Sequence, residues 1–108
     1  LHQENRTGRP AHRDIMYYRL GYAAWKLGLD EEARRYLAVA EPGLRRDVFK
    51  LSDLAGVYTS MRDMRKAYEL YSDLYDRLEE GEAKDKLARL LGALRKRLDG
   101  DAGEVTSP

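Results

Sequence analysis

The sequence contains no cysteine, which excludes disulfides and thiolate chemistry but leaves the compartment open. Histidine is scarce as well: His2 and His12 both fall in a polar N-terminal segment, and no spacing ties either of them to a fixed partner. The acidic run at residues 30–32 fits a helix start better than a cation site, because no loop of alternating oxygen ligands follows it. No glycine-rich phosphate loop is present. We therefore expect no enzyme activity, no cofactor and no metal site.

Long apolar runs and a strong net charge are also missing. No stretch approaches the length of a membrane span. Twenty Lys/Arg against nineteen Asp/Glu give a net charge of +1, so no polyanionic partner is required. We expect a soluble chain, cytoplasmic or associated with a bacterial envelope, with no direct membrane insertion. No nucleic-acid partner is expected, since no dedicated motif accompanies the basic residues.

The 108 residues present are enough for one domain with a modest core. Residues 1–13 are polar and predict a flexible linker, residues 14–98 a helical domain, and residues 99–108 a flexible tail. In the domain, apolar and small residues recur at helical spacing in five segments. Gly28 is placed to end the first helix with a left-handed cap, Asp30 to cap the second, and Pro42-Gly43 to stop it.

Small and apolar residues recur along this domain at one fixed interval, which we call the repeat interval. The pairs are Leu20 and Leu54, Ala33 and Ala67, Leu37 and Tyr71, and Ala40 and Leu74. This interval matches the period of a two-helix solenoid unit, which is about 34 residues. The sequence therefore predicts an all-α fold, an antiparallel helix-pair solenoid of about five helices, with units at 14–43 and 45–81 and a capping helix at 82–98.

The two units resemble tetratricopeptide repeats (TPRs). In the first, the residues that match the family's large, small and turn positions are Tyr17, Leu20, Gly21, Ala24, Gly28, Ala33, Leu37 and Ala40. In the second they are Leu51, Leu54, Ala55, Tyr58, Ala67, Tyr71 and Leu74. The second unit departs from the family in having Arg62 at the turn glycine and no closing proline. The resemblance implies a right-handed stack of helix pairs that binds other proteins, with the fifth helix as a terminal cap.

The first helix carries a second apolar face, formed by Ile15, Tyr18, Tyr22 and Trp25, one residue out of step with its expected core stripe of Tyr17, Leu20, Ala24 and Leu27. In the family, the first helix of each pair lines a concave surface. The resemblance thus places on that surface Ile15, Tyr18, Tyr22, Trp25 and Lys26 from the first unit and Phe49, Ser52, Asp53 and Gly56 from the second. Aromatic side chains beside a floor of small residues predict a groove for a bulky side chain or for an extended or helical segment. The family's carboxylate clamp is not expected, because Tyr18 and Tyr22 occupy the positions where basic and amide groups are needed.

Other interpretations of these surfaces stay open. A preceding repeat could cover the aromatic face, or the face could mediate homo-oligomerisation, which would make the chain a structural segment of a longer solenoid in a multidomain or membrane-associated protein. Residues 82–98 hold six Lys/Arg against two acids. Such a basic helix suits a cap that needs a charged exterior, and also an anionic membrane surface or an acidic partner.

Overall fold

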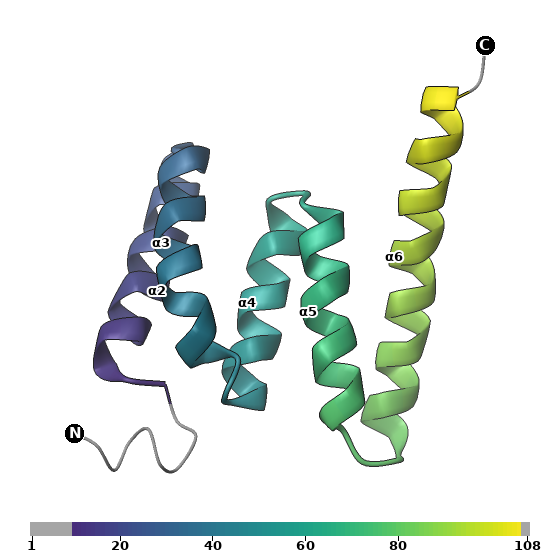
Figure 1. The fold of residues 1–108 in the computed structure, drawn as a ribbon, viewed down its shortest axis with the longest axis horizontal. Coiled ribbons are helices and arrows are strands. Elements are labelled where there is room, and N and C mark those ends of the chain that lie inside the picture. The colour runs from purple at the N-terminus through teal and green to yellow at the C-terminus, as the bar shows by residue number, and fades with distance from the viewer. Residues whose placement is uncertain (1–9, 107–108) are drawn as a thin grey trace.

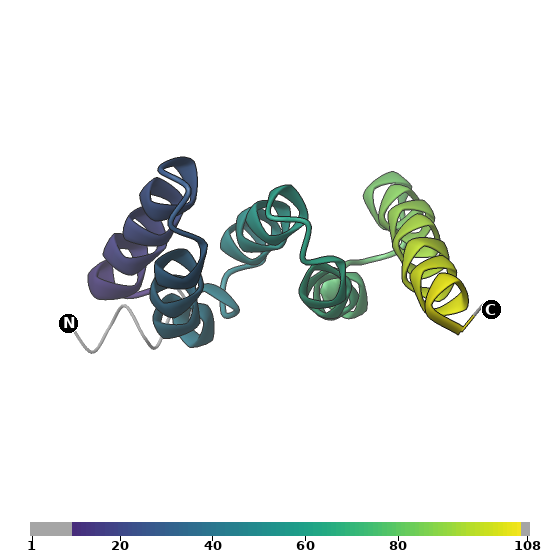
Figure 2. The same cartoon turned by 90° about the horizontal axis from the view of Figure 1, so that it is seen from above.

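The computed structural model describes the backbone of residues 10–106, and this part of the chain forms five α-helices. They are α2 (His12–Lys26), α3 (Asp30–Leu44), α4 (Val48–Ser60), α5 (Met64–Arg77) and α6 (Glu82–Thr106). The helices alternate in direction, and each packs mainly on its neighbours in sequence (Figure 1). Seen from above, α2, α4 and the start of α6 lie along one side, which we call the α2–α4–α6 side, while α3 and α5 lie along the other (Figure 2). The predicted all-α class with five helices is confirmed.

Small residues set the spacing between the helices of the first pair. Ala33, Leu37 and Ala40 of α3 are fully buried. Gly21 of α2 approaches α3 so closely that a Cβ on it would lie 2.7 Å from both Cγ and Cδ2 of Leu37. Two helices can approach this far only where one side chain is absent, and dense packing then fills the space beside it.

The turns inside the two helix pairs share a backbone conformation. Gly28 has φ +81°, as its expected role in a left-handed cap requires. Arg62, which stands one repeat interval later, has φ +63° and lacks the freedom that glycine has in this position. A non-glycine residue in the left-handed region is strained. The second turn therefore keeps the geometry of the first although its sequence departs from it.

The hydrogen bonds around these turns repeat with the same period. The Leu29 amide donates to the Ala24 carbonyl at 2.9 Å, and the Asp63 amide donates to the Tyr58 carbonyl, also at 2.9 Å. Leu29 is the N-cap of α3 and makes no side-chain cap, so the prediction that Asp30 caps this helix is wrong: Asp30 is already its first helical residue. Asp63 does cap α5, by accepting a backbone N–H from the first turn.

Several predicted element ends differ from the structure. α2 begins at His12, within the expected linker, whose residues 1–9 lie outside the described part of the chain. α3 runs through Pro42 to Leu44, because Gly43 and Leu44 are buried and tertiary contacts hold the last turn helical. α6 continues to Thr106, well past the predicted end at residue 98, since adding a residue to an existing helix costs far less than starting one.

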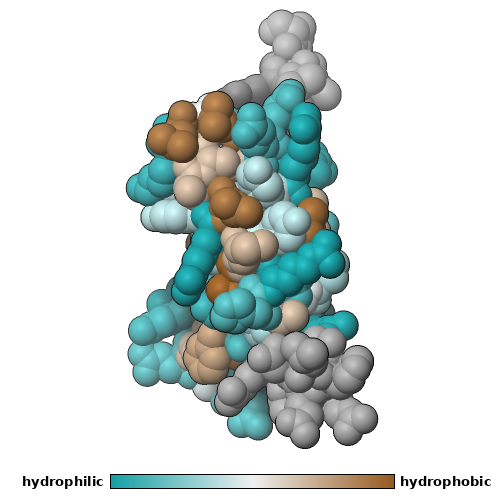
Figure 3. All heavy atoms as spheres, turned by 90° about the vertical axis from the view of Figure 1, so that its left-hand side faces the viewer, coloured by the Kyte–Doolittle hydropathy of each residue, from teal (hydrophilic) through white to brown (hydrophobic). Residues whose placement is uncertain are grey.

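The expected core stripe of α2 is wrong at two positions. Leu20 is 40% exposed and Leu27 is 76% exposed. At 100° per residue, Leu20 lies to one side of the positions that α2 buries against α3, Gly21 and Ala24, and Leu27 follows the last residue of α2, so both are left partly or largely exposed at the α2 end of the row. Figure 3 faces this end and shows apolar side chains running over it between hydrophilic ones.

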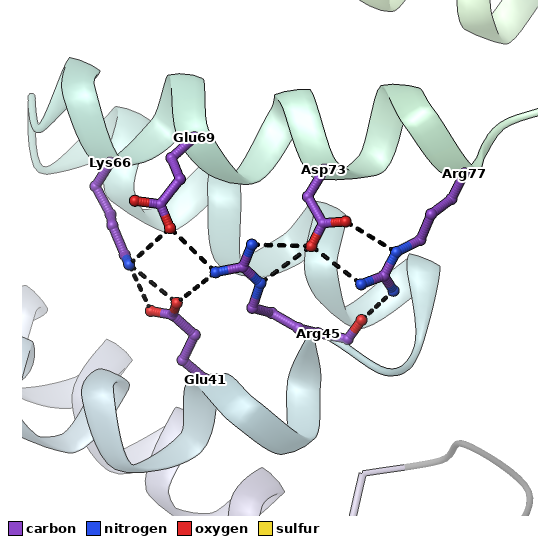
Figure 4. A network of polar contacts seen from close by, with 6 residues as sticks. All are labelled: Glu41, Arg45, Lys66, Glu69, Asp73 and Arg77. Carbon is purple, nitrogen blue, oxygen red and sulfur yellow. Dashed lines mark hydrogen bonds and ion pairs between the residues drawn. The ribbon is translucent and has the colours of Figure 1, made fainter.

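A network of charged side chains joins α3 to α5 (Figure 4). Its members are Glu41, Arg45, Lys66, Glu69, Asp73 and Arg77. Arg45 lies at the centre: its Nη1 is 2.9 Å from Glu41 and 3.0 Å from Glu69, and its Nη2 is 3.0 Å from Asp73. Partial burial acts to lower the pKa of Arg45, but hydrogen bonds to the three carboxylates outweigh it and raise the pKa. These contacts tie the two helix pairs together on the side opposite α2 and α4.

The last helix packs on the second pair, as the sequence predicts for residues 82–98. Leu87 and Leu94 of α6 are buried, and the contacts of α6 are made mainly with α5. Lys84 Nζ lies 4.6 Å from the centre of the Tyr75 ring, so a cation–π contact accompanies the apolar packing. This packing covers the side of α5 that faces away from the first helix pair.

Candidate protein-interaction surface

Helix α2 presents different side chains to different surroundings because successive residues turn by 100°. Gly21 and Ala24 are buried toward α3, as described above. Tyr18 is half-buried and packs against the main core. Tyr22 stays 41% exposed. The second apolar face predicted for this helix is thus divided between residues that join the core and residues that meet solvent.

The outer part of that face is an aromatic cluster formed by exposed Tyr22 and Lys26 and half-buried Trp25. The ring centres of Tyr22 and Trp25 are 5.7 Å apart, with the planes inclined by 58°. Lys26 Nζ lies 5.6 Å from the centre of the Tyr22 ring and 5.0 Å from that of Trp25. Tilted rings at this distance attract one another, and a cation above their faces adds to the attraction. The three side chains therefore hold each other in place at the surface.

Tyr18 connects this cluster to α4. Burial is the largest cause that raises the pKa of its phenol, followed by the negative charge of Asp53 on α4 and by Tyr22. The phenol accordingly stays protonated well into the alkaline range. Tyr18, Tyr22 and Asp53, which the sequence assigns to one surface, thus influence one another electrostatically.

Phe49 is the most exposed large apolar side chain of the described residues, at 79%. It lies in the first turn of α4, where the Asp47 side chain fixes the backbone by accepting the amides of Phe49 at 2.8 Å and Lys50 at 3.3 Å. Four residues after Phe49, Asp53 is exposed and its Oδ2 lies 3.9 Å from Lys50 Nζ. The cap fixes the backbone that carries the ring, and the exposure of the ring is not compensated by packing within the described residues.

An apolar groove of about 350 Å³ runs between α4, α5 and α6. It is lined by Ser52, Tyr71, Leu74, Leu78, Ala83, Lys86, Leu87 and Leu90. Leu90 remains exposed at its rim, whereas Leu74 and Leu87 are buried at its base. A groove of this size takes one or two apolar side chains of a partner.

The predicted site residues are distributed over these features. Ser52 lines the groove, and Gly56 stands near it, since a Cβ on Gly56 would lie 3.9 Å from the Tyr71 hydroxyl. Ser52 and Gly56, the small residues expected to form a groove floor beside the α2 aromatics, therefore lie near Tyr71 of α5. Ile15 lies at a separate surface hollow of about 250 Å³, which it shares with His12, Met16 and Arg19.

Sequence reasoning missed the α5 and α6 contributions to the groove. Leu78, Lys86 and Leu90 line the groove but are not among the site residues that the sequence predicts. Leu90 follows Leu87 by three residues and precedes Leu91, so the apolar sector of this helix is wider than a single stripe. An apolar sector wider than a single stripe indicates that one of its side chains is left at the surface, here at the rim of the groove.

Two further properties concern other kinds of site. Among the side chains that the structure describes, those of residues 10–100, no group of three or more His, Asp or Glu is arranged to hold a metal ion. None of the described helices is long and apolar enough to cross a membrane.

Comparison with protein-family models, with curated proteins and with solved structures finds no match to this chain.

Proposed function

We propose that the chain is a TPR-like module without catalytic activity that binds a peptide or helix of a partner protein on its α2–α4–α6 side. The observation that carries this proposal is the aromatic cluster of Tyr22 and Trp25, with exposed Phe49 and Leu90 on neighbouring helices of the same side. The aromatic cluster on α2, Phe49 on α4 and the groove beside α6 all belong to helices that line this side (Figure 2). Isolated exposed apolar residues are ordinary, whereas gathered aromatics with a groove are typical of interaction sites.

The repeat assignment is supported by the turns. The left-handed residues Gly28 and Arg62 and the hydrogen bonds around them recur at the repeat interval. Ala33 and Ala67, which are separated by the same interval, are both fully buried. A repeated helix pair with these features favours a stack in which one helix of each pair lines the binding side.

The chemistry of the surface favours an apolar or aromatic anchor in the partner. Trp25 and Tyr22 offer tilted ring faces with Lys26 beside them, a setting that suits a large side chain. The groove near Leu90 offers a second, aliphatic contact. We propose that a helix or strand of the partner crosses from the aromatic cluster to the groove.

Selection of binders from a displayed peptide library on the immobilised protein, followed by calorimetry, tests this function. A variant with Tyr22→Ala and Trp25→Ala should lose more than tenfold in affinity, because aromatic hot spots contribute about 2 kcal/mol or more each. Leu90→Asp should also weaken binding. Val39→Ala, which removes exposed apolar surface from α3, is the matched control and should bind normally.

Circular dichroism separates lost binding from lost folding. Tyr22 is substantially exposed, and half-buried Trp25 is not one of the side chains packed against the main core, so the double variant should keep its helical signal and most of its stability. Selected peptides that bind the double variant as tightly as the original chain, or that lose affinity through Val39→Ala alone, would place the interaction elsewhere.

A structural role is the second candidate function, and one observation favours it. Five of the eight exposed large apolar residues, Met16, Leu20, Leu27, Leu29 and Val39, belong to the first helix pair and its turn rather than to the aromatic cluster. Their arrangement is developed below.

A further inference from the structure

The outer surface of the first helix pair carries a further apolar surface, which is distinct from the aromatic face of α2 and from the proposed binding side. Met16, Leu20 and Leu27 follow one another along α2 at spacings of four and seven residues, with exposed Ala23 between them. These spacings put all four on one stripe of a helix. Figure 3 looks onto this face, which we call the end face, and shows its apolar side chains extending along the helix direction.

Helix α3 extends the end face sideways. Val39 is exposed on it, while Ala33, Leu37 and Ala40 of the same helix are buried toward the interior. The opposite flank of α3 is already used, because Glu41 and Arg45 make ion pairs with α5. No described helix packs on the flank that carries Val39, and the contacts of α2 are made mainly with α3.

Charge is distributed unevenly along this face. At the end where α2 starts, His12 and Arg13 are exposed. At the opposite end, where α2 finishes and α3 starts, the first turn of α3 carries Asp30, Glu31 and Glu32, all exposed, with exposed Lys26 and Arg35 nearby. The end face is therefore an apolar stripe with a basic end at Arg13 and an acidic end at the first turn of α3, where Lys26 and Arg35 offset part of the charge.

We infer that the occupant of the end face is a second copy of this chain, related by a two-fold axis that passes near Leu20. With the two α2 helices antiparallel, Leu20 meets its counterpart and the basic end of each copy meets the acidic end of the other. Arg13 then lies close to the acidic first turn of the partner copy's α3, near Glu32, which shares the flank of Val39 because it stands seven residues before it. A parallel arrangement would put the two acidic ends together, which like-charge repulsion disfavours.

The size of the face sets the strength of this association. A helix of 15 residues is about 22 Å long, and two adjacent helices are roughly 20 Å wide, so each copy offers on the order of 450 Å². The two copies together bury about 900 Å², which is below the standard size of a stable interface. The dimer should therefore be weak and reversible.

Sedimentation velocity between about 5 and 500 μM tests the inference. The mass should rise from that of a 12.5 kDa chain toward twice that value over this range. Leu20→Glu should leave a monomer at every concentration and retain helicity, because Leu20 is not part of the core. Phe49→Glu is the matched control: it places the same charge on the α2–α4–α6 side and should not change the association.

Charge reversal tests the orientation. Arg13→Glu and Glu32→Lys should each weaken self-association, whereas an equimolar mixture of the two variants should form mixed dimers, since one contact is then Glu–Lys and the other is the original pair. Monomers at the highest concentration, dissociation by Phe49→Glu, or no recovery in the mixture would overturn the inference. Retained peptide binding by Leu20→Glu keeps this outcome distinguishable from a failure of the proposed function.

Discussion

Replacing Gly21 with alanine tests the packing that defines the first helix pair. Alanine in place of glycine in an exposed helix stabilises by about 0.5 to 1 kcal/mol, because glycine loses more backbone freedom on folding. At Gly21 this gain is opposed by contacts. The added Cβ would lie 2.7 Å from Leu37 Cγ and Cδ2 and 3.2 Å from the Ala33 carbonyl oxygen.

The opposing contribution is the larger one. Leu37 is fully buried, and because its Cγ is as close as its Cδ2, rotating one methyl group does not relieve the clash. Overpacking of this kind costs typically about 1 to 3 kcal/mol, and this geometry belongs in the upper half of that range. Gly21→Ala should therefore destabilise by a net of about 1 to 2 kcal/mol, lowering the melting temperature by roughly 5 to 15 °C.

Two other helical glycines provide matched controls. A Cβ on Gly56 would meet only the Tyr71 hydroxyl, at 3.9 Å, and one on Gly92 would meet nothing within 4 Å. Alanine at either position should raise the melting temperature by a few degrees, as the about 0.5 to 1 kcal/mol of helix propensity implies.

A double-mutant cycle locates the clash. Leu37→Ala alone leaves a cavity that costs about 2 to 5 kcal/mol, and the Gly21→Ala methyl group would partly fill it. The two substitutions should thus be less destabilising together than the sum of their separate effects, by about 1 kcal/mol or more. Thermal denaturation followed by circular dichroism measures all four proteins. If Gly21→Ala stabilised the chain as the controls do, the close approach of α2 and α3 would be refuted.

Two further predictions concern the second helix pair. Arg62→Gly should stabilise the chain by about 0.5 to 1 kcal/mol, because relief of the left-handed strain exceeds glycine's entropic cost. Arg65→Gly inside α5 is the control and should destabilise. If chemical denaturation gave both variants the same change in the free energy of unfolding, Arg62 would not be strained. Burial acts to raise the pKa of Asp63, but hydrogen bonds and charges from Arg34 and Lys66 outweigh it and hold this pKa below its ordinary value of 3.8. The pKa of Glu69 is likewise held below its ordinary value of 4.5, chiefly by Lys66. Because the folded pKa values are depressed, the stabilisation from these two carboxylates is present above about pH 4.5 and is lost as the pH falls further. The melting temperature should therefore be flat from pH 7 to 5 and then fall, and it should fall less steeply in Asp63→Asn. An equal fall in that variant would show that Asp63 does not contribute.

The sequence alone determined that the chain is helical, where most of its turns lie and which small residues are buried. These features follow from local rules: a period of 3.6 residues marks the helices, and Gly28 marks a left-handed turn. The repeat interval extended the interpretation from local to repeated structure. It correctly paired Ala33 with Ala67 as fully buried positions. It also placed Arg62 at the second turn, although the residue type argued against that conformation.

Tertiary structure decided which apolar residues are left exposed. The periodicity of α2 shows that Leu20, Leu27, Tyr18 and Trp25 are apolar, but a helix with several apolar faces does not say which neighbour each face meets. Leu20 and Leu27 point to the end of the row, where no described helix packs, whereas Tyr18 joins the core beside α4. That choice depends on the angle between helices, which no local pattern fixes.

Contacts between residues far apart in the sequence were likewise beyond a local pattern. Arg45 of α3 pairs with Asp73 of α5, and Ser52 of α4 shares a groove with Leu90 of α6. A charged residue at a helix end and a leucine beside a leucine stripe each have an ordinary local explanation. Only the packing of α3 against α5 and of α5 against α6 converts the first into an ion-pair network and the second into the rim of a groove, because distance in space, not spacing in sequence, decides which side chains interact.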